Sequence, residues 1–296
     1  MNVTASSLSR IWFPVLILLS LLGGIVWFCW PHPQRAVYSL YRERGRSRTL
    51  AGLEQYEMRA SPHVEVYYTE QDENVVDWVL KATEAAYLPV TEAIGHEPPV
   101  RVPVIIYPSR DELRTAFGWS NGESAMGVYW SGTVRLLSPN VWINEKTDKE
   151  KRKVFDRLNP IAHELTHYVF DYLTDGNYPR WFTEGLAQRV EYHHTGYLWL
   201  EPESTLNQPL YSLRDLEERF DQLQNQPLAY RQSFLLVDYL ARVYGEESLA
   251  GLVDRLGEGI RFADAVHQIT GNSMSTIYSD WHSWTINHSG ELEAAG

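Results

Sequence analysis

The sequence contains a single cysteine among 296 residues, so Cys29 has no partner for an intramolecular disulfide. Basic residues are also scarce beyond the first 48 positions. Those positions hold six arginines and one acidic residue, whereas the whole chain has 26 basic and 38 acidic residues. The remaining residues therefore include 20 basic and 37 acidic ones, a net charge of −17. Because a surface of that charge repels a phosphate backbone, we expect no nucleic-acid partner.

Formal charge is missing altogether from residues 11–30, which are rich in leucine, isoleucine, valine and tryptophan. That length matches what a helix needs to cross a bilayer. Trp12, Trp27 and Trp30 lie towards its ends, where aromatic side chains favour the membrane interface. A cleaved signal peptide and a buried helix are the alternatives, but the run is long for a signal peptide and no small-residue cleavage site follows it. We predict a short tail over residues 1–10, a single-pass membrane anchor over 11–30 and a juxtamembrane segment over 31–60.

The strongest chemical pattern is H-E-x-x-H, at His163-Glu164-Leu165-Thr166-His167. Helix signals surround it, because Asn159 suits the N-cap, Pro160 suits the first helical position and Gly176 suits a left-handed end. Two histidines four positions apart on a helix share one face, so both imidazoles can bind one Zn²⁺. The glutamate between them can then act as a base on a metal-activated water.

A second helix is predicted to begin near Pro179 and to carry Glu184 and Gly185 in its first turns. A short connection between two helices favours an antiparallel hairpin, which would direct Glu184 back towards the two histidines as a third ligand. Gly185, which has no side chain, would let these two helices approach closely. The alternative is that Glu184 is an ordinary acid near a helix start, where the helix dipole favours negative charge.

The H-E-x-x-H sequence, with sixteen residues between His167 and the glutamate of Trp-Phe-Thr-Glu-Gly-Leu-Ala, resembles the gluzincin zinc metallopeptidases. More narrowly, it is similar to bacterial peptidase MA-like domains. The resemblance covers about thirty residues. It implies His163, His167 and Glu184 as ligands of one Zn²⁺ per chain, and Glu164 as the general base. It also implies a peptide or protein substrate and an extracytoplasmic domain.

The predicted fold is α+β and zincin-like over residues 61–290. It combines a small mixed or antiparallel sheet, an edge strand packed on the H-E-x-x-H helix, and a mainly helical C-terminal half. Strands are predicted at 63–69 and 100–107, with Pro103 indicating a sheet edge or bulge, and a hairpin at 125–138 around Ser131-Gly132. Its first strand either pairs with an extended peptide or simply ends the sheet.

Several helices are predicted around these strands. The helix over 73–94 is expected to kink or end at Pro89, and Ser109 is expected to cap a short helix ending at Phe117. The charged residues 144–157 are expected to form a solvated loop or to lead into a helix. The C-terminal helices are predicted at 212–223, 227–244, 246–256, 262–269 and 273–284.

Further site residues are indicated less directly. A second group that polarises the substrate carbonyl is common in such sites, and Tyr230 is the candidate, with Arg231 and His194 behind it. The alternative for Tyr230 is a packed core tyrosine. Gln188 and Asp171, each one turn from a predicted ligand, are candidates for orienting the ligand side chains.

The membrane orientation is indicated in two opposite ways. Five arginines follow the apolar run and only Arg10 precedes it, which by the positive-inside rule places the domain in the cytoplasm. The resemblance and the cysteine-free domain favour the extracytoplasmic side, which we expect.

The sequence therefore predicts a membrane-anchored zinc peptidase, either an endopeptidase or an aminopeptidase. Two alternatives stay open: a non-catalytic membrane sensor or scaffold that retains the fold, and a zinc hydrolase of a non-peptide bond. An intact Glu164 argues against the scaffold, which would not need a base.

Overall fold

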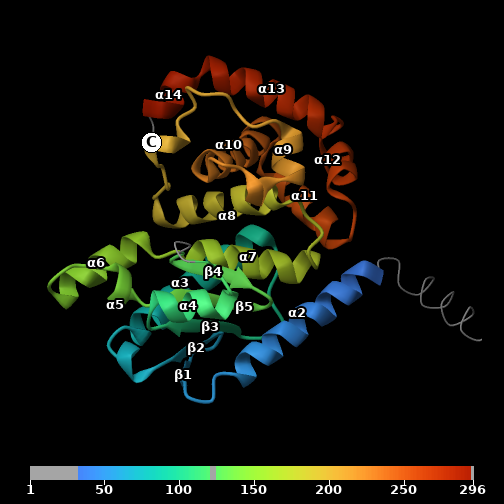
Figure 1. Cartoon of the computed structure of the whole chain (residues 1–296). Helices are drawn as coiled ribbons and strands as arrows, with labels where there is room; N and C mark the ends of the chain where they lie inside the picture. The colour runs from blue at the N-terminus through green and yellow to red at the C-terminus, as the bar shows by residue number, and fades with distance from the viewer. Residues whose placement is uncertain (1–32, 121–124, 295–296) are drawn as a thin grey trace, which may run out of the picture.

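The computed structural model describes residues 33–120 and 125–294 (Figure 1). Its sheet has five strands in the order β1-β2-β3-β5-β4. The strands are β1 (Glu57–Ala60), β2 (Val64–Tyr68), β3 (Val102–Tyr107), β4 (Gly127–Trp130) and β5 (Thr133–Leu137). β2, β3 and β5 run parallel, whereas β1 and β4 pair antiparallel at the two edges. The predicted mixed sheet with β4 as an edge strand is confirmed.

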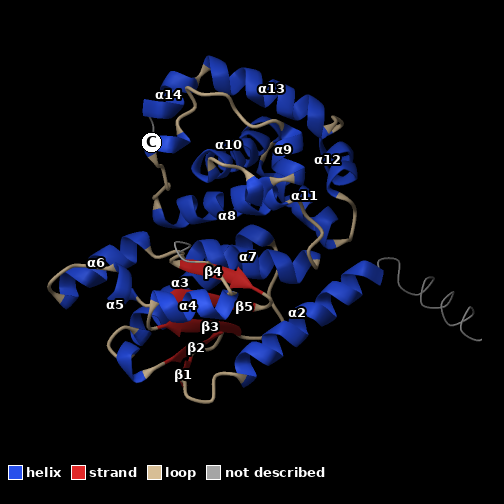
Figure 2. Cartoon of the chain, in the orientation of Figure 1, coloured by secondary structure: helices blue, strands red, loops and turns tan. Residues whose placement is uncertain are grey.

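Helices surround the sheet and make up the C-terminal half. Figure 2 shows the strands confined to one half, with α7 and α8 between the sheet and most of the helices that follow them in the chain. The α-helices of the first half are α2 (Pro33–Ala51), α3 (Val76–Ile94), α4 (Arg110–Phe117), α5 (Pro139–Trp142), α6 (Asp148–Leu158) and α7 (Ile161–Thr174). The later ones are α8 (Arg180–Thr195), α9 (Leu213–Glu218), α10 (Gln226–Tyr244), α11 (Glu246–Gly257), α12 (Phe262–Thr270), α13 (Met274–Asn287) and α14 (Ser289–Ala294). Single 3-10 turns are η1 (Glu70–Asp72), η2 (Pro202–Ser204) and η3 (Phe220–Gln222).

Strand β3 is buried on both faces, which places the core on both sides of the sheet. Val102, Val104 and Ile106 pack into the large cluster that contains α3 and α7. Ile105 and Tyr107 alternate with them and pack on the opposite face, against α4. A strand that is covered on both faces reads as a continuous apolar run, as this one does.

The structure contradicts an end of the helix at Pro89 and a sheet edge or bulge at Pro103. α3 continues through Pro89 to Ile94. Proline has no N–H, so the carbonyl of Ala85 loses its helical partner, but Ala85 and Pro89 are both exposed to water. Pro103 lies in the central strand β3. The N–H of Val102 points towards β2, so the main-chain nitrogen of Pro103 points towards β5. The pairing of β3 with β5 starts only at the next residue, Val104. No ladder hydrogen bond is lost there.

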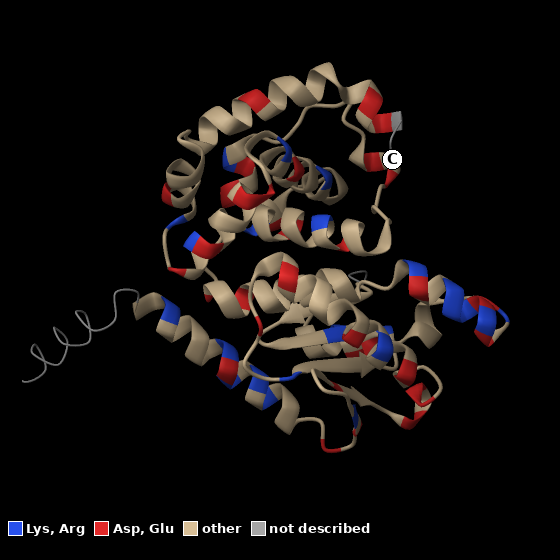
Figure 3. Ribbon diagram, turned by 180° about the vertical axis from the view of Figure 1, so that it is seen from behind, with Lys and Arg blue, Asp and Glu red and all other residues tan. Residues whose placement is uncertain are grey.

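Other predicted elements are confirmed with changed boundaries. Ser109 caps α4 through the N–H of Glu112. The charged stretch 144–157 forms most of α6, which Thr147 caps, and basic residues gather on this helix (Figure 3). The helix expected over 212–223 ends at Glu218, and η3 follows it. The remaining C-terminal helices lie close to their predicted positions.

The predicted anchor over residues 11–30 lies outside the described residues. Within the two described ranges, no helix combines the length and apolar character needed to cross a membrane. Residues 33–60, expected as a juxtamembrane segment, form α2 and β1. β1 pairs with β2, and Arg42 of α2 is only 5% exposed because it contacts Asp171 of α7.

Gly185 does allow a close helix contact, but its neighbour is α10 and not α7 as expected. A Cβ atom at position 185 would lie 2.6 Å from the carbonyl carbon of Ser233 and 2.7 Å from Cγ2 of Val237. Glu184 faces α7, and the next residue is rotated by about 100° around the helix axis. Gly185 therefore faces the helix on the other side of α8.

We expect Gly185→Ala to lower the free energy of unfolding by roughly 1–3 kcal/mol, because the backbone of α10 would have to move away. Thermal denaturation of the full chain measures this change. Gly290→Ala is the matched control, since Gly290 is exposed in α14 and a Cβ there would meet nothing within 4 Å. Equal melting temperatures for the two variants would contradict the close packing of α8 on α10.

Candidate metal centre

The helix that carries the H-E-x-x-H sequence begins and ends almost as predicted. α7 starts at Ile161, one residue later than expected, and the side chain of Asn159 accepts a hydrogen bond from the Ile161 N–H at 3.3 Å. Its left-handed end begins at Asp175 (φ 50°), and Gly176 continues it (φ 76°). The helix thus presents His163, Glu164 and His167 towards the helical half.

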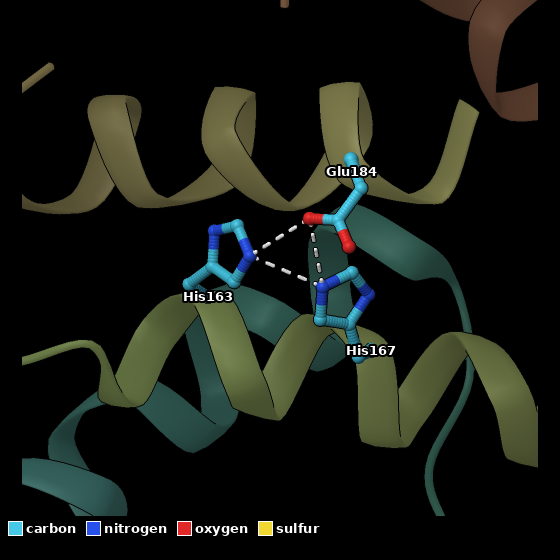
Figure 4. A group of neighbouring side chains, drawn as sticks. All are labelled: His163, His167 and Glu184. Atoms are coloured by element: carbon cyan, nitrogen blue, oxygen red, sulfur yellow. Dashed lines mark hydrogen bonds and ion pairs between the residues drawn. The ribbon is translucent and has the colours of Figure 1, made fainter. Parts of the chain in front are cut away.

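His163, His167 and Glu184 converge between α7 and α8 (Figure 4). The two Nε2 atoms lie 3.1 Å apart. Oε2 of Glu184 lies 3.2 Å from Nε2 of His163 and 3.3 Å from Nε2 of His167. Ligand atoms bound tetrahedrally at about 2.0–2.2 Å from one Zn²⁺ are separated by about 3.3–3.6 Å. The three atoms are therefore spaced almost as such an ion requires.

The electrostatics of this group favour a cation. Burial raises the pKa of Glu184, but His167 and Arg180 outweigh it and hold the pKa well below its usual range. Burial lowers the pKa of His163, yet Glu184 and Glu191 raise it well above its usual range. Two nitrogens and one carboxylate oxygen are also a donor set that suits zinc. The residues present fit a bound metal ion.

Other residues than those expected orient the three ligand side chains. Nδ1 of His167 lies 2.8 Å from Oγ1 of Thr183, and Nδ1 of His163 lies 3.4 Å from a carboxylate oxygen of Glu191. Arg180 holds the second oxygen of Glu184 at 2.8 Å. Each contact leaves the ligand atoms free to converge. All three residues come from α8, and the spacing of Arg180 four positions before Glu184 was the signal that could have identified it.

The two residues expected in that role make other contacts. The side-chain amide of Gln188 donates to the main-chain oxygen of Tyr230 at 2.9 Å and so connects α8 to α10. Asp171, one turn beyond His167 on α7, accepts hydrogen bonds from Tyr129 and Tyr178 among others. Neither contact involves a ligand histidine.

Glu164 lies beside the three ligand residues and touches the edge strand. Its Oε2 accepts a hydrogen bond from the Tyr129 N–H at 2.6 Å. Burial raises the pKa of Glu164, and the two histidines offset part of this effect. β4 can approach so closely because a Cβ at Gly127 would lie 2.8 Å from Pro160 Cγ and 2.9 Å from Glu164 Cγ. The edge strand thus holds one oxygen of this carboxylate beside the candidate metal centre.

A cleft opens over this group, and Tyr230 is one of its walls. The cleft is lined by Met126, Gly127, Pro160, His163, Glu164, Gln188, Glu191, Trp199, Glu201, Gln226, Pro227 and Tyr230. Burial and the acids Glu184 and Glu164 raise the pKa of Tyr230. The structure therefore places Tyr230 near the ligands. Arg231 pairs instead with Glu293, and His194 is exposed near the end of α8.

A mixed sheet whose edge strand lies on an H-E-x-x-H helix, with a third ligand from the next helix, defines a zincin-like metallopeptidase domain. The chain belongs to the Peptidase MA superfamily, whose family model matches residues 84–287. That match includes both α7 and α8. Membership supports a peptidase-like hydrolase activity.

The chain is also similar to a solved structure of aminopeptidase A from Legionella pneumophila in complex with aspartic acid. The identity is 12% and the TM-score 0.49, over 77% of this chain and 28% of that chain. This chain thus spans little more than a quarter of the length of that protein. No curated protein matches the chain.

Replacing Thr183 by valine should weaken metal binding about 10- to 100-fold, because His167 loses the partner that fixes its ring. Competition of the metal-free protein with a chelating dye, using Zn²⁺ as the probe, measures the affinity. Thr183→Ser keeps the hydroxyl and is the matched control, so its affinity should stay near that of the wild type. Unchanged affinity in Thr183→Val would show that the hydroxyl does not hold His167.

Proposed function

We propose that the protein is a zinc-dependent peptidase in which Glu164 is the general base. The observation that carries the proposal is the near-tetrahedral spacing of the three ligand atoms, 3.1–3.3 Å, next to a cleft that both His163 and Glu164 line. His163, His167 and Glu184 would hold the metal. A scaffold without activity would need neither the buried Glu164 nor the open cleft.

Each residue then has a defined task in peptide hydrolysis. A bound metal would supply Lewis acidity to the scissile carbonyl and would acidify water. Glu164 takes a proton from the attacking water and passes it to the leaving amine. The raised pKa of Glu164 suits the first step, since a more basic carboxylate accepts a proton more readily. Tyr230, at the wall of the cleft, donates a hydrogen bond to the developing oxyanion.

The edge of β4 is the proposed place for an extended peptide. Met126 pairs with β5 through its main-chain oxygen, so the main-chain groups of Gly127 and Tyr129 point away from the sheet. The Tyr129 N–H is bonded to Glu164, whereas Gly127 lines the cleft. A peptide can therefore add to the sheet at Gly127 and lie across the metal-binding group.

Membrane anchoring by residues 11–30 is part of the proposal, with the peptidase domain on the extracytoplasmic side. The length and apolar character of the run support the anchor. The absence of cysteine after the run is consistent with an exported domain.

Glu164→Gln should retain one Zn²⁺ per chain and lower the rate of peptide hydrolysis by about 10²–10⁴-fold, because the base is lost and the ligands are not. Glu184→Gln is the matched variant, and it should lose peptidase activity because it no longer holds the metal. Zinc content and cleavage of an unstructured, fluorescently labelled protein measure both effects. Activity that survives Glu164→Gln would refute the assigned base, and full zinc retention in Glu184→Gln would refute the third ligand.

The orientation can be tested with one introduced cysteine. Cys29→Ala removes the native thiol, and Ser279→Cys then places a thiol on the exposed side of α13. We expect a membrane-impermeant maleimide to label this variant in intact spheroplasts, and not to label Cys29→Ala alone. Labelling that occurs only after permeabilisation would place the domain in the cytoplasm.

A further inference from the structure

A buried carboxylate on α7 accepts hydrogen bonds from residues of three separate segments. Asp171 has an exposure of 0%. Its Oδ1 accepts hydrogen bonds from the hydroxyls of Tyr38 at 2.6 Å and Tyr178 at 3.0 Å, and its Oδ2 accepts one from Tyr129 at 2.6 Å. Nη1 of Arg42 lies 3.3 Å from Oδ2 and donates to the main-chain oxygen of Asp171 at 2.9 Å. The proposed reaction steps use none of the residues of this cluster, which are Asp171, Tyr38, Arg42, Tyr129 and Tyr178.

Tyr129 connects the cluster directly to the general base. Its hydroxyl is bonded to Asp171 while its main-chain N–H is bonded to Glu164 at 2.6 Å. The two acceptors are seven residues apart on α7, or about 10 Å along the axis. One residue of β4 therefore spans two turns of α7 and fixes the strand along the helix. Burial and the Asp171 carboxylate raise the pKa of Tyr129 well above its usual range, so the phenol remains a donor.

α2 holds the same hairpin from its other end. The hydroxyl of Ser131, in the β4–β5 turn, donates to the main-chain oxygen of Arg42 at 3.3 Å. A Cβ at Gly45 would lie 2.9 Å from Cβ of Ser131, so the helix and the turn are in close contact. Further along α2, Thr49 accepts a hydrogen bond from Arg135 of β5 at 2.9 Å. α2 thus contacts the hairpin at its turn and on its second strand, in addition to contacting Asp171.

We propose that Tyr129 and Asp171 are positioning residues for Glu164, and that Arg42 of α2 completes this arrangement. The Tyr129–Asp171 hydrogen bond holds β4 in place, and the N–H of Tyr129 then holds one oxygen of Glu164, which leaves the other oxygen directed at the reacting water. The inference rests on the proposed function in one respect, since it assumes that Glu164 is the base.

Two tyrosines offer a matched test in the full chain. Tyr129→Phe and Tyr178→Phe each remove one hydroxyl that donates to the Asp171 carboxylate. Of these two tyrosines, Tyr129 also donates its main-chain N–H to Glu164. We expect Tyr129→Phe to lower kcat about tenfold with KM within about twofold of the wild type, since orientation of the base matters in the transition state. Tyr178→Phe should retain the wild-type kcat. Equal kcat values for the two variants would overturn the proposal.

Amide hydrogen exchange of the zinc-free protein gives a readout that is independent of activity. The Tyr129 N–H faces away from β5, so its protection comes from Glu164 and not from the sheet. We expect the amide of residue 129 to exchange at least about tenfold faster in Tyr129→Phe than in Tyr178→Phe. Equal exchange rates would overturn the proposal even if the wild type cleaves peptides.

Arg42→Lys tests the part played by α2, and it also serves if Tyr129→Phe does not fold. Lysine keeps the charge, but its one nitrogen cannot replace the guanidinium, whose Nη1 contacts Asp171 and Asp175 while Nε contacts Glu43 and Nη2 contacts Ser39. We expect a lower kcat, an unchanged KM and faster exchange at residue 129. A wild-type kcat and exchange rate in this variant would overturn the role of α2. If the wild type cleaves no peptide, the proposed function fails, and the exchange rates alone then decide this inference.

Discussion

The candidate site depends on the burial of one carboxylate. Glu184 is 1% exposed, and an ionised carboxylate in such a place is strongly destabilising unless it is paired. Arg180 contacts one of its oxygens, and the two imidazoles contact the other. The contacts that compensate the buried charge are therefore the contacts that gather the three ligand atoms. α8 cannot dock on α7 in this way without forming a group that attracts a cation.

α8 organises its surroundings through the spacing of its residues. Arg180, Glu184 and Gln188 recur every four positions, which places them along one face. The first two complete the metal-binding group, and Gln188 connects to the main chain of Tyr230 on α10. Gly185 on the adjacent face lets α10 come close enough for that bond. One helix thus sets both the ligand geometry and the position of the opposite wall of the cleft.

Much of this arrangement could be predicted from sequence because its signals are local. The H-E-x-x-H spacing, the flanking caps and the Ser131-Gly132 turn each act within a few residues, and the structure confirms the elements they predicted. The misses required knowledge of distant neighbours. The partner of Gly185 lies almost fifty residues later in the chain, and the role of Thr183 depends on how α8 is rotated against α7. Arg42 is 129 residues from Asp171, and from sequence its arginine-rich segment indicated only the orientation of the chain in the membrane.

The edge strand limits how a peptide can be recognised. In β4 the Tyr129 N–H is already bonded to Glu164, so a peptide that adds to the sheet as proposed pairs with the outward main-chain groups of Gly127 but not with that N–H. Main-chain pairing of this extent carries little information about sequence, because every peptide offers the same groups. Discrimination among substrates must then come from side chains around the cleft. Trp199 and Glu201, at its exposed rim, offer an aromatic surface and a negative charge for that purpose.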